Sequence, residues 1–481
     1  MNRRMILHMV GRILQIEAAL LLLPLLTALI YTEWNVSLSF LATIAVAAGI
    51  GTLFTLIGKT RDRTIFAREG FIIVAFAWIF MSAIGALPFV FSREIPSFVD
   101  AFFETVSGFT TTGASILTDV EAMSHGLLFW RSFTHWVGGM GVLVFIMAIF
   151  PSESGRSIHI MRAEMPGPIV GKLVPKIRDT AKILYLIYIG MTALLVVLLL
   201  CGGMNLFESL IHAFGTAGTG GFGVKADSIS GYSPYIQWVI TVFMLLFGVN
   251  FNLYYLILIG RARAALKSGE MWCYTAIVLL SSAAIAVNIA PLYETAAETI
   301  RHAAFQVSSI MTTTGYATAD FNLWPGFSKM ILVILMFIGG CAGSTAGGLK
   351  VSRVMLLIKS IRRDVKRMLH PRSVAVVKLE DKAVDEPTIH GTTVYLTVYF
   401  VIFFAILLLL SLEPFDFEST FTAVSACFNN IGPGLGAVGP AAGFADFSPF
   451  GKFLLSAAML LGRLEIFPLL VAFSPATWTK K

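Results

Sequence analysis

The sequence predicts an all-α integral membrane protein: four span–pore helix–span units around one central pore, plus an N-terminal two-helix hairpin, with ten spans in all. One observation is composition, because 57% of the residues are hydrophobic and only 13% are charged, about half the charged share of a soluble protein. Another is a series of apolar runs, each close to the roughly 20 residues that a bilayer-crossing helix needs. Between such runs, a shorter segment that ends in glycine recurs four times.

The apolar runs divide the chain into five parts. The first two runs, 9–30 and 37–58, have no Gly-ended segment between them, so residues 1–58 are predicted to form the separate hairpin. Four pore repeats follow, at 59–150, 151–260, 261–370 and 371–481. In order, each repeat contains a span, a half-length segment and a second span: 69–91, 99–113 and 128–150; 181–203, 206–220 and 234–260; 271–293, 298–315 and 327–358; 392–412, 417–432 and 450–472.

The half-length segments end in similar residues. Thr-Thr-Thr-Gly occurs at 110–113 and again at 312–315, and looser copies lie at 217–220 and 429–432. Inside a bilayer, backbone that leaves the helix must be buried or line a water-filled cavity. Glycine lets carbonyls take directions that a Cβ forbids, and a ring of carbonyls can replace the hydration shell of an ion. The pattern therefore predicts a cation pore, although helix-packing glycines are an alternative. The candidate filter residues are Thr111, Thr112, Gly113, Gly218, Thr219, Gly220, Thr313, Thr314, Gly315, Asn430, Ile431 and Gly432.

A glycine-rich segment, 339–350, interrupts the apolar run 327–358. Its five glycines each cost a helix about 1 kcal/mol relative to alanine. The segment is therefore predicted to break the helix and cross beneath the filter. A continuous helix packed closely against its neighbours is the alternative interpretation. A phosphate-binding loop is excluded, because the segment lacks the spacing GxxxxGK[ST].

Arg463 lies near the centre of the predicted span 450–472. An arginine at this depth costs a few kcal/mol, so it is expected to face a cavity or a partner. A pore-facing cation that tunes permeation is the preferred hypothesis. A structural pair with Glu465, Glu208 or another acid stays open.

The charged residues gather in alternate loops. Basic residues cluster at 59–68, 156–178, 261–267 and 359–372, and at the end of the chain, whereas the other loops carry acids such as Glu33, Asp119 and Glu413. Because cytoplasmic loops collect Lys and Arg, both termini are expected to be cytoplasmic and the Gly-ended loops to open outward. The run 359–372 is either an ordinary positive-inside loop or a dock for a regulatory subunit.

Several other classes of function find no support in the sequence. The pI of about 9.2 does not predict nucleic-acid binding, because the basic residues lie in short loops between apolar runs. The GxGxxG match at 434–439 follows no strand, so a dinucleotide site is not expected. No cluster of His, Cys, Asp and Glu has metal-ligand spacing, and no Ser/His/Asp set can be argued. We therefore expect neither a cofactor nor an enzyme.

The chain resembles the bacterial TrkH/TrkG family of potassium-uptake proteins, within the wider Trk/Ktr/HKT superfamily. The likeness rests on the four half-length segments and on the stretches 109–113, 135–141, 339–350 and 462–465. It implies potassium uptake across the bacterial cytoplasmic (inner) membrane through a selective, channel-like pore driven by the membrane potential, with membrane lipid around it. Gly113, where some sodium-passing relatives carry serine, implies a preference for potassium.

The resemblance also implies a gate and partners. Family members use the intramembrane loop as a gate, and they work as homodimers with a cytosolic TrkA-type nucleotide-binding ring. A symporter that couples K⁺ to H⁺ or Na⁺ remains the alternative, with Glu465 as the main candidate for its titratable group. The candidate gate residues are Gly343, Ser344, Thr345, Gly347, Gly348, Lys350 and Arg463.

Overall fold

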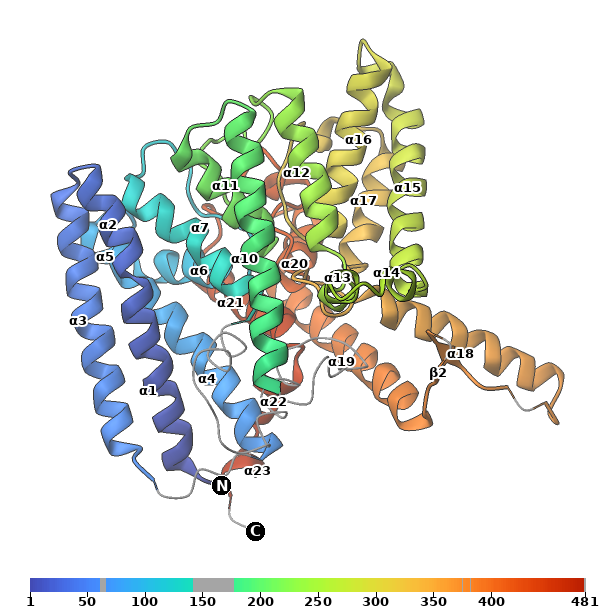
Figure 1. The fold of residues 1–481 in the computed structure, drawn as a ribbon, viewed down its shortest axis with the longest axis horizontal. Coiled ribbons are helices and arrows are strands. Elements are labelled where there is room, and N and C mark those ends of the chain that lie inside the picture. Colours follow the sequence, from blue (N-terminus) through green and yellow to red (C-terminus); the bar gives the residue numbers. More distant parts are fainter. Residues whose placement is uncertain (61–65, 142–176, 374, 381, 480–481) are drawn as a thin grey trace.

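The computed structural model describes residues 1–60, 66–141, 177–373, 375–380 and 382–479. Within them the fold is helical (Figure 1), apart from a two-stranded antiparallel hairpin of β1 (Lys378–Leu379) and β2 (Lys382–Ala383). The predicted basic residues at 156–176, Arg61, Arg63 and the last two lysines lie outside the described residues.

The N-terminal hairpin is present as expected. It consists of α1 (Arg3–Leu20), α2 (Leu22–Ile30) and α3 (Trp34–Ile57), and α1 and α2 together make one candidate span. A Cβ on Gly11 would lie 2.6 Å from the carbonyl oxygen of Gly51. Glycine at this crossing lets α1 and α3 approach closely, as small residues do between membrane helices.

The remaining helices follow the order of the predicted repeats. The first group is α4 (Ala67–Gly85), α5 (Leu87–Ser92), α6 (Phe98–Phe109) and α7 (His125–Gly139). The second is α10 (Ile177–Cys201), α11 (Leu206–Gly218), α12 (Pro234–Phe247), α13 (Phe251–Leu258) and α14 (Ala262–Ala265). The third is α15 (Gly269–Ile289), η1 (Ala290–Leu292), α16 (Ala296–Met311), η2 (Phe321–Leu323), α17 (Gly326–Phe337) and α18 (Val351–Leu369). The fourth is α19 (Glu386–Leu410), α20 (Phe417–Phe428), η3 (Gly436–Val438), α21 (Pro449–Arg463), α22 (Phe467–Phe473) and α23 (Pro475–Trp478).

Fewer continuous spans are present than the ten predicted. In the described ranges six helices are long and apolar enough to cross a membrane, or eight if each bent helix pair counts as one span. The prediction of a continuous span at 234–260 was wrong, because α12 and α13 meet at 92°. The one at 450–472 was also wrong, since α21 and α22 meet at 118°. In the run 327–358, the helix α17 ends at Phe337, so this run is not one continuous helix. The end of the run 128–150 lies outside the described residues.

Local sequence explains both bends. The α12 helix ends at Phe247 with Gly248 as its C-cap, and the side chain of Asn250 then caps α13 by accepting a hydrogen bond from the Asn252 N–H at 2.9 Å. Between α21 and α22, Glu465 and Ile466 adopt φ of 53° and 67°, whereas every residue of a right-handed helix has negative φ. Hydropathy averages over these short interruptions, which is why the sequence predicted unbroken spans.

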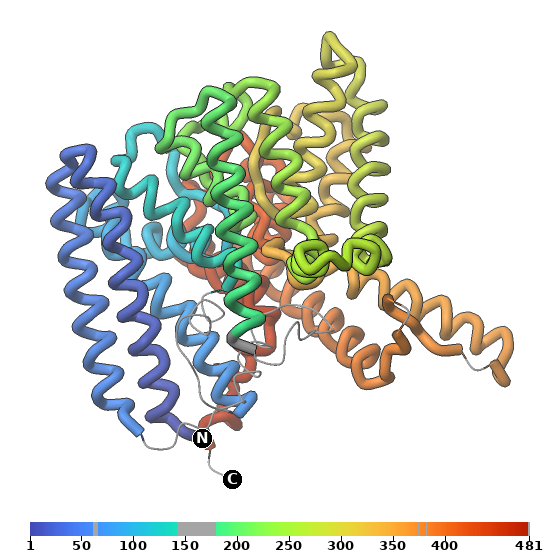
Figure 2. The backbone as a smooth tube through the Cα atoms, viewed as in Figure 1, coloured from blue at the N-terminus to red at the C-terminus, as the bar shows by residue number. Residues whose placement is uncertain are grey.

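The two ends of the chain lie together at one edge of the molecule (Figures 1 and 2). The guanidinium of Arg3 donates to the carbonyl of Trp478 at 3.1 Å and lies over its indole ring. The termini are therefore on the same side, as the distribution of basic residues predicted. Which side of the membrane that is stays a prediction.

Candidate functional site

Four short helices, α6, α11, α16 and α20, end in the same hydrogen-bond motif. In α6, the Thr111 N–H donates to the Gly108 carbonyl at 3.1 Å, and the Thr112 N–H donates to the Ser107 carbonyl at 2.9 Å. This pair of bonds is the Schellman motif, which satisfies the last carbonyls of a helix. The same two spacings recur from Thr219 and Gly220, from Thr313 and Thr314, and from Asn430 and Ile431.

The residue that turns the chain out of each helix is left-handed. Thr111, Thr219, Thr313 and Asn430 have φ of 55°, 56°, 57° and 57°. Glycine is the usual residue here, and a β-branched residue at positive φ is an outlier. Such conformations persist where the surrounding structure enforces them, and they cluster at functional sites. Three strained threonines at one repeated position therefore mark the four loops as a candidate site.

A second left-handed residue, two positions later, is always glycine, and it corrects one prediction. Positive φ is found at Gly113 (81°), Gly221 (79°), Gly315 (85°) and Gly432 (100°). The second loop contains two adjacent glycines, and the sequence analysis matched Gly220 to Gly113. Because Thr219 occupies the position of Thr111, Gly221 is the equivalent glycine, and the predicted set Gly218, Thr219 and Gly220 is one residue early.

These glycines close the four loops into a ring. A Cβ on Gly113 would overlap the carbonyl oxygen of Gly220, and one on Gly221 would overlap that of Thr314. In the same way Gly315 faces the carbonyl of Ile431, and Gly432 faces that of Thr112, where the distance is 2.9 Å. Each loop thus touches the next, and the fourth returns to the first. The predicted filter residues Thr112, Thr314 and Ile431 all supply carbonyls to these contacts.

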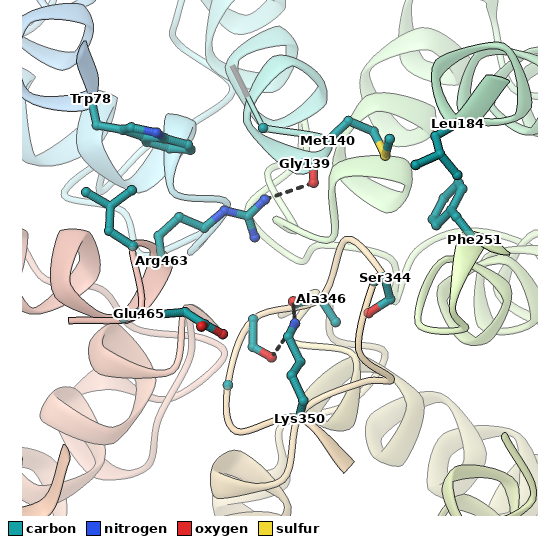
Figure 3. Close-up of a pocket in the computed structure, with 16 residues that line it drawn as sticks. Trp78, Gly139, Met140, Leu184, Phe251, Ser344, Ala346, Lys350, Arg463 and Glu465 are labelled. Atoms are coloured by element: carbon teal, nitrogen blue, oxygen red, sulfur yellow. Dashed lines mark hydrogen bonds between the residues drawn. The ribbon is translucent and has the colours of Figure 1, made fainter. Parts of the chain in front are cut away.

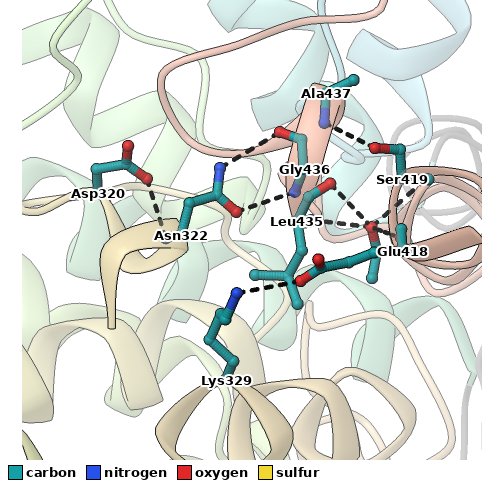
Figure 4. A network of polar contacts seen from close by, with 9 residues as sticks. Asp320, Asn322, Lys329, Glu418, Ser419, Leu435, Gly436 and Ala437 are labelled. Carbon is teal, nitrogen blue, oxygen red and sulfur yellow. Dashed lines mark hydrogen bonds and ion pairs between the residues drawn. The ribbon is translucent and has the colours of Figure 1, made fainter. Parts of the chain in front are cut away.

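The segments that follow the glycines are joined in the same cyclic order. The first link comes from α7, whose Arg131 side chain donates to the Gly223 carbonyl at 3.3 Å. The others run from the Ile229 N–H to the Ala317 carbonyl (3.0 Å), from Asn322 to Gly436 (3.0 and 3.3 Å), and from the Phe444 N–H to the Ser115 carbonyl (2.8 Å). Figure 4 shows how the Asn322 amide binds both backbone groups of Gly436, with the Lys329–Glu418 ion pair nearby. The ring is therefore closed at two levels.

A buried ion pair braces the first loop. The Arg131 Nε lies 2.5 Å from Glu104, and both residues are less than 5% exposed. The carboxylate also accepts from the Ser115 hydroxyl and the Ile116 N–H, both at 3.0 Å. The Arg131 guanidinium lies 3.5 Å from the centre of the Phe222 ring. The pair thus holds the chain after Gly113 against the chain after Gly221.

The intramembrane segment predicted at 339–350 is a folded loop that leaves the helix. It is closed at its base, where the Gly339 N–H donates to the Leu349 carbonyl at 2.7 Å. On one side the Cys341 N–H binds the carbonyl of Gly248, at the end of α12, at 2.9 Å. On the other side the Gly347 N–H donates to the Thr313 hydroxyl at 2.6 Å. The loop therefore lies between the ring and the bend of α12 and α13.

Two charged side chains hold the loop in place. Glu270, on α15, accepts from the Ala342 N–H at 2.7 Å and from the Ser352 N–H at 3.0 Å. Lys350 is buried, and its ammonium donates to the carbonyls of Ala346 and Gly347. An ammonium carries three donors, so Lys350 ties the end of the loop back to its own middle.

Arg463 binds the loop from the opposite side. It is the last residue of α21 rather than the centre of a span, because the helix breaks directly after it. Its guanidinium donates to the Thr345 carbonyl at 3.0 Å and to the carbonyls of Gly138 and Gly139 at 2.6 and 2.9 Å. The last two belong to the C-terminal end of α7, where a cation is favoured. Arg463 thus bridges α7 and the loop.

Glu465 forms a bidentate ion pair with Arg353. The two guanidinium nitrogens lie 2.8 and 2.6 Å from its two carboxylate oxygens, and the guanidinium carbon lies 4.2 Å from the centre of the Tyr395 ring. Glu208, the other acid named as a possible partner of Arg463, accepts from Tyr232 at 3.1 Å.

The loop, Arg463 and the end of α7 enclose a cavity of about 50 Å³ (Figure 3). Its lining includes the predicted gate residues Gly343, Ser344, Gly347, Gly348, Lys350 and Arg463. The cavity has room for water and borders Gly347, whose N–H binds Thr313 of the ring. The structure thus brings the predicted filter and gate residues together.

The sequence analysis missed Gly221, Glu270, Arg353 and the Arg131–Glu104 pair. Glu104, Arg131 and Arg353 were visible as charges within predicted apolar segments, since Glu104 lies in 99–113, Arg131 in 128–150 and Arg353 in 327–358. A charge at membrane depth is itself a sign of a functional or paired residue. Their partners could not be identified, because the pairs join separate segments.

Comparisons with known proteins agree with this architecture. Residues 36–480 match the family model described as "TrkH: Cation transport protein". The Trk system potassium uptake protein TrkH of Salmonella typhimurium is 38% identical over 485 residues, which cover 99% of this chain and 100% of that protein. TrkG of Escherichia coli K12 is 32% identical over 482 residues, 99% and 98% of the two chains.

A solved structure is also similar. The crystal structure of the potassium transporter TrkH from Vibrio parahaemolyticus superposes with a TM-score of 0.90 at 33% identity, and the match covers 100% of both chains. The resemblance found in the sequence is therefore confirmed, and the protein is a multi-pass membrane transporter rather than an enzyme. The chain belongs to the TrkH family of cation transport proteins.

Proposed function

We propose that this protein takes up K⁺ across the bacterial cytoplasmic membrane through a selective, channel-like pore. The observation that carries the proposal is the closed ring of four left-handed loops, in which each glycine faces a carbonyl of the next loop. Its relatives are potassium uptake proteins by name. An inside-negative potential supplies about 2.3 kcal/mol per charge per 100 mV, so uptake needs no chemistry in this chain.

Carbonyls of the ring replace water around the ion. The backbone turns at Thr111, Thr219, Thr313 and Asn430, and glycines two residues later keep side chains out of the ring. Carbonyl rings of this kind give K⁺ channels their selectivity. The four short helices end at the loops, so the negative ends of their dipoles favour a cation there.

The loop 339–350 acts as the gate in this proposal, together with Lys350 and Arg463. Its contacts support the role: one hydrogen bond joins the loop to Thr313 of the carbonyl ring, and Arg463 joins the loop to α7. A few of these bonds decide whether the loop blocks the path. A change of loop position that breaks them opens the pore.

Partners complete the proposal, namely a second copy of the chain and a cytosolic TrkA-type nucleotide-binding ring. Both are expected from the family resemblance, with both termini cytoplasmic. The helix α18 continues from the loop and projects from the molecule (Figure 1), with exposed Arg362, Lys366 and Arg367. This helix offers the cytosolic nucleotide-binding ring a direct connection to the gate.

Coupled symport is the less favoured alternative. It requires a titratable group in the path, and Glu465 was the candidate. Its bidentate pair with Arg353 gives the carboxylate a structural role, because breaking such a pair leaves an unpaired charge.

Ion flux tests the proposal. Purified protein in liposomes should pass K⁺ and Rb⁺ and largely exclude Na⁺, and the K⁺ flux should follow the membrane potential without needing a pH gradient. Equal fluxes of K⁺ and Na⁺ would contradict the selective pore. Uptake that stops when the pH gradient is removed would favour the symporter.

Thr313→Val tests the gate. Valine keeps the branched shape but removes the hydroxyl that accepts from the Gly347 N–H at 2.6 Å. A lost hydrogen bond of about 1 kcal/mol net corresponds to about a fivefold increase in K⁺ flux. Thr111→Val is the matched control, since the Thr111 hydroxyl is buried without a hydrogen-bond partner among the described residues. Equal K⁺ flux in the two variants would show that the hydrogen bond between Thr313 and Gly347 has no role in gating.

A further inference from the structure

An apolar groove of about 530 Å³ lies between α10 and α13, on the outer surface of the molecule. Ile183, Gly190 and Met191 line it from α10, and Tyr254 and Leu258 line it from α13. Leu186 and Leu258 at its edges are 68% and 72% exposed. Because α10 is a candidate membrane span, its exposed apolar side faces lipid chains. The groove is therefore open to the hydrocarbon of the bilayer.

Exposed basic residues adjoin the residues that line this groove. Lys182 is exposed on α10 next to Ile183, and Arg261 is exposed three residues after Leu258. Arg263, on α14, and Lys267, beyond its end, are also exposed, and Asp179 is the acid nearest in sequence to Lys182. Lys182 and Arg261, the two basic residues next to the groove lining in sequence, outnumber Asp179 and leave a positive excess there. Apolar walls with adjoining positive charges match a phospholipid whose headgroup is anionic.

The helix α13 connects this groove to the intramembrane loop. At its start, the Phe251 N–H donates to the Gly343 carbonyl at 3.0 Å. Phe251 of α13 and Leu184 of α10 line the cavity beside Arg463 (Figure 3), whereas Leu258 of α13 and Ile183 of α10 line the groove. The helix has only eight residues, so an occupant at its far end acts on a short, stiff element that contacts the loop.

We propose that the groove between α10 and α13 binds an anionic phospholipid, with an acyl chain along Gly190 and Met191 and the headgroup near Lys182 and Arg261. The bound lipid fixes α13 and so sets the position of the loop at Gly343. This inference rests on the proposed function and adds regulation by lipid to it. Each basic residue near an anionic headgroup corresponds to about a fivefold change in affinity.

The first experiment titrates the lipid. K⁺ flux is measured in liposomes of phosphatidylcholine with increasing fractions of phosphatidylglycerol, and native mass spectrometry counts the phosphatidylglycerol retained by each chain. Wild type should change its flux by about fivefold or more across the titration and retain the lipid. The double variant Lys182→Gln/Arg261→Gln removes two basic groups, so it should need about twenty-five times more phosphatidylglycerol for half the effect, and should retain less.

A variant that fills the groove provides the sharper test. Gly190 lines the groove, and no heavy atom lies within 4 Å of a Cβ placed on it, so the backbone accepts a side chain there and Gly190→Phe puts a ring into the groove. Gly49→Phe is the matched control, since Gly49 has the same open surroundings on the exposed side of α3. Gly190→Phe should lose both the retained lipid and the dependence of flux on phosphatidylglycerol. Gly49→Phe should behave like wild type.

The outcomes separate this inference from the proposed function. If Gly190→Phe and wild type both pass K⁺ selectively and depend on phosphatidylglycerol to the same extent, the lipid site is wrong. The proposed function is not affected by that result. Flux that ignores phosphatidylglycerol in wild type overturns it too. If no lipid mixture supports K⁺ flux, the proposed function fails, while lipid retained by wild type and lost in Gly190→Phe still supports the site.

Discussion

Gly221→Ala will reduce the preference for K⁺ over Na⁺ by about tenfold or more. Gly221 has φ of 79°, a conformation that costs an alanine about 1–2 kcal/mol, and a Cβ there would overlap the carbonyl of Thr314. Relief of that overlap must move a carbonyl of the ring. A change of 1.4 kcal/mol in the relative fit of two ions is about tenfold in selectivity. Relative K⁺, Rb⁺ and Na⁺ fluxes in liposomes measure it.

Matched glycine variants separate selectivity from folding. Gly113→Ser should act like Gly221→Ala, since its Cβ overlaps the carbonyl of Gly220. Gly223→Ala is the neutral control, because the nearest atom to its Cβ is 3.4 Å away, an ordinary contact. A Cβ on Gly138 would overlap the Phe109 carbonyl outside the ring, so Gly138→Ser should lower the melting temperature instead. If Gly221→Ala keeps the wild-type preference for K⁺ over Na⁺, Gly221 is not part of the filter.

The alignment of the second loop with the other three, in which Gly221 and not Gly220 is equivalent to Gly113, could not be read from the sequence. The second loop contains Thr219 followed by two glycines, so the residue letters permit two alignments with Thr111-Thr112-Gly113. The φ angles and the Schellman hydrogen bonds distinguish them. The short helices themselves were predictable, because glycine and hydroxyl residues after a half-length apolar segment are hard to accommodate in a continuous membrane helix.

The bent spans show a second limit. A hydropathy window averages across Gly248–Asn250 and across Leu464–Ile466, and both remain apolar overall. What breaks the helices there is local: an Asn cap at α13 and two left-handed residues before α22. The partners of buried charges were likewise unpredictable, since Arg353 and Glu465 are 112 residues apart. The need for such a partner was predictable from the cost of a charge in the membrane.

Arg463→Ala will increase K⁺ conductance by about tenfold or more. The side chain carries a fixed positive charge beside the cavity, and a charge about 4 Å from an ion raises its energy by about 4 kcal/mol at an effective dielectric near 20. A guanidinium stays protonated at any usable pH, so this barrier should not titrate. Alanine removes the charge together with the hydrogen bonds to Thr345, Gly138 and Gly139.

The variant Arg463→Lys distinguishes two roles of Arg463: repulsion of the ion by its positive charge, and the hydrogen bonds by which it joins α7 to the loop. Lysine keeps the positive charge, but its compact ammonium lacks the rigid fork with which arginine spans α7 and the loop. Single-channel recording should therefore show a unit current near wild type and a larger open fraction, whereas the alanine variant should raise both. Detergent melting on the same proteins checks the fold. Equal unit currents in the lysine and alanine variants would rule out the charge barrier, and an unchanged open fraction in both would rule out the bridge. If the alanine variant melts much earlier with wild-type current, Arg463 serves the fold and not permeation.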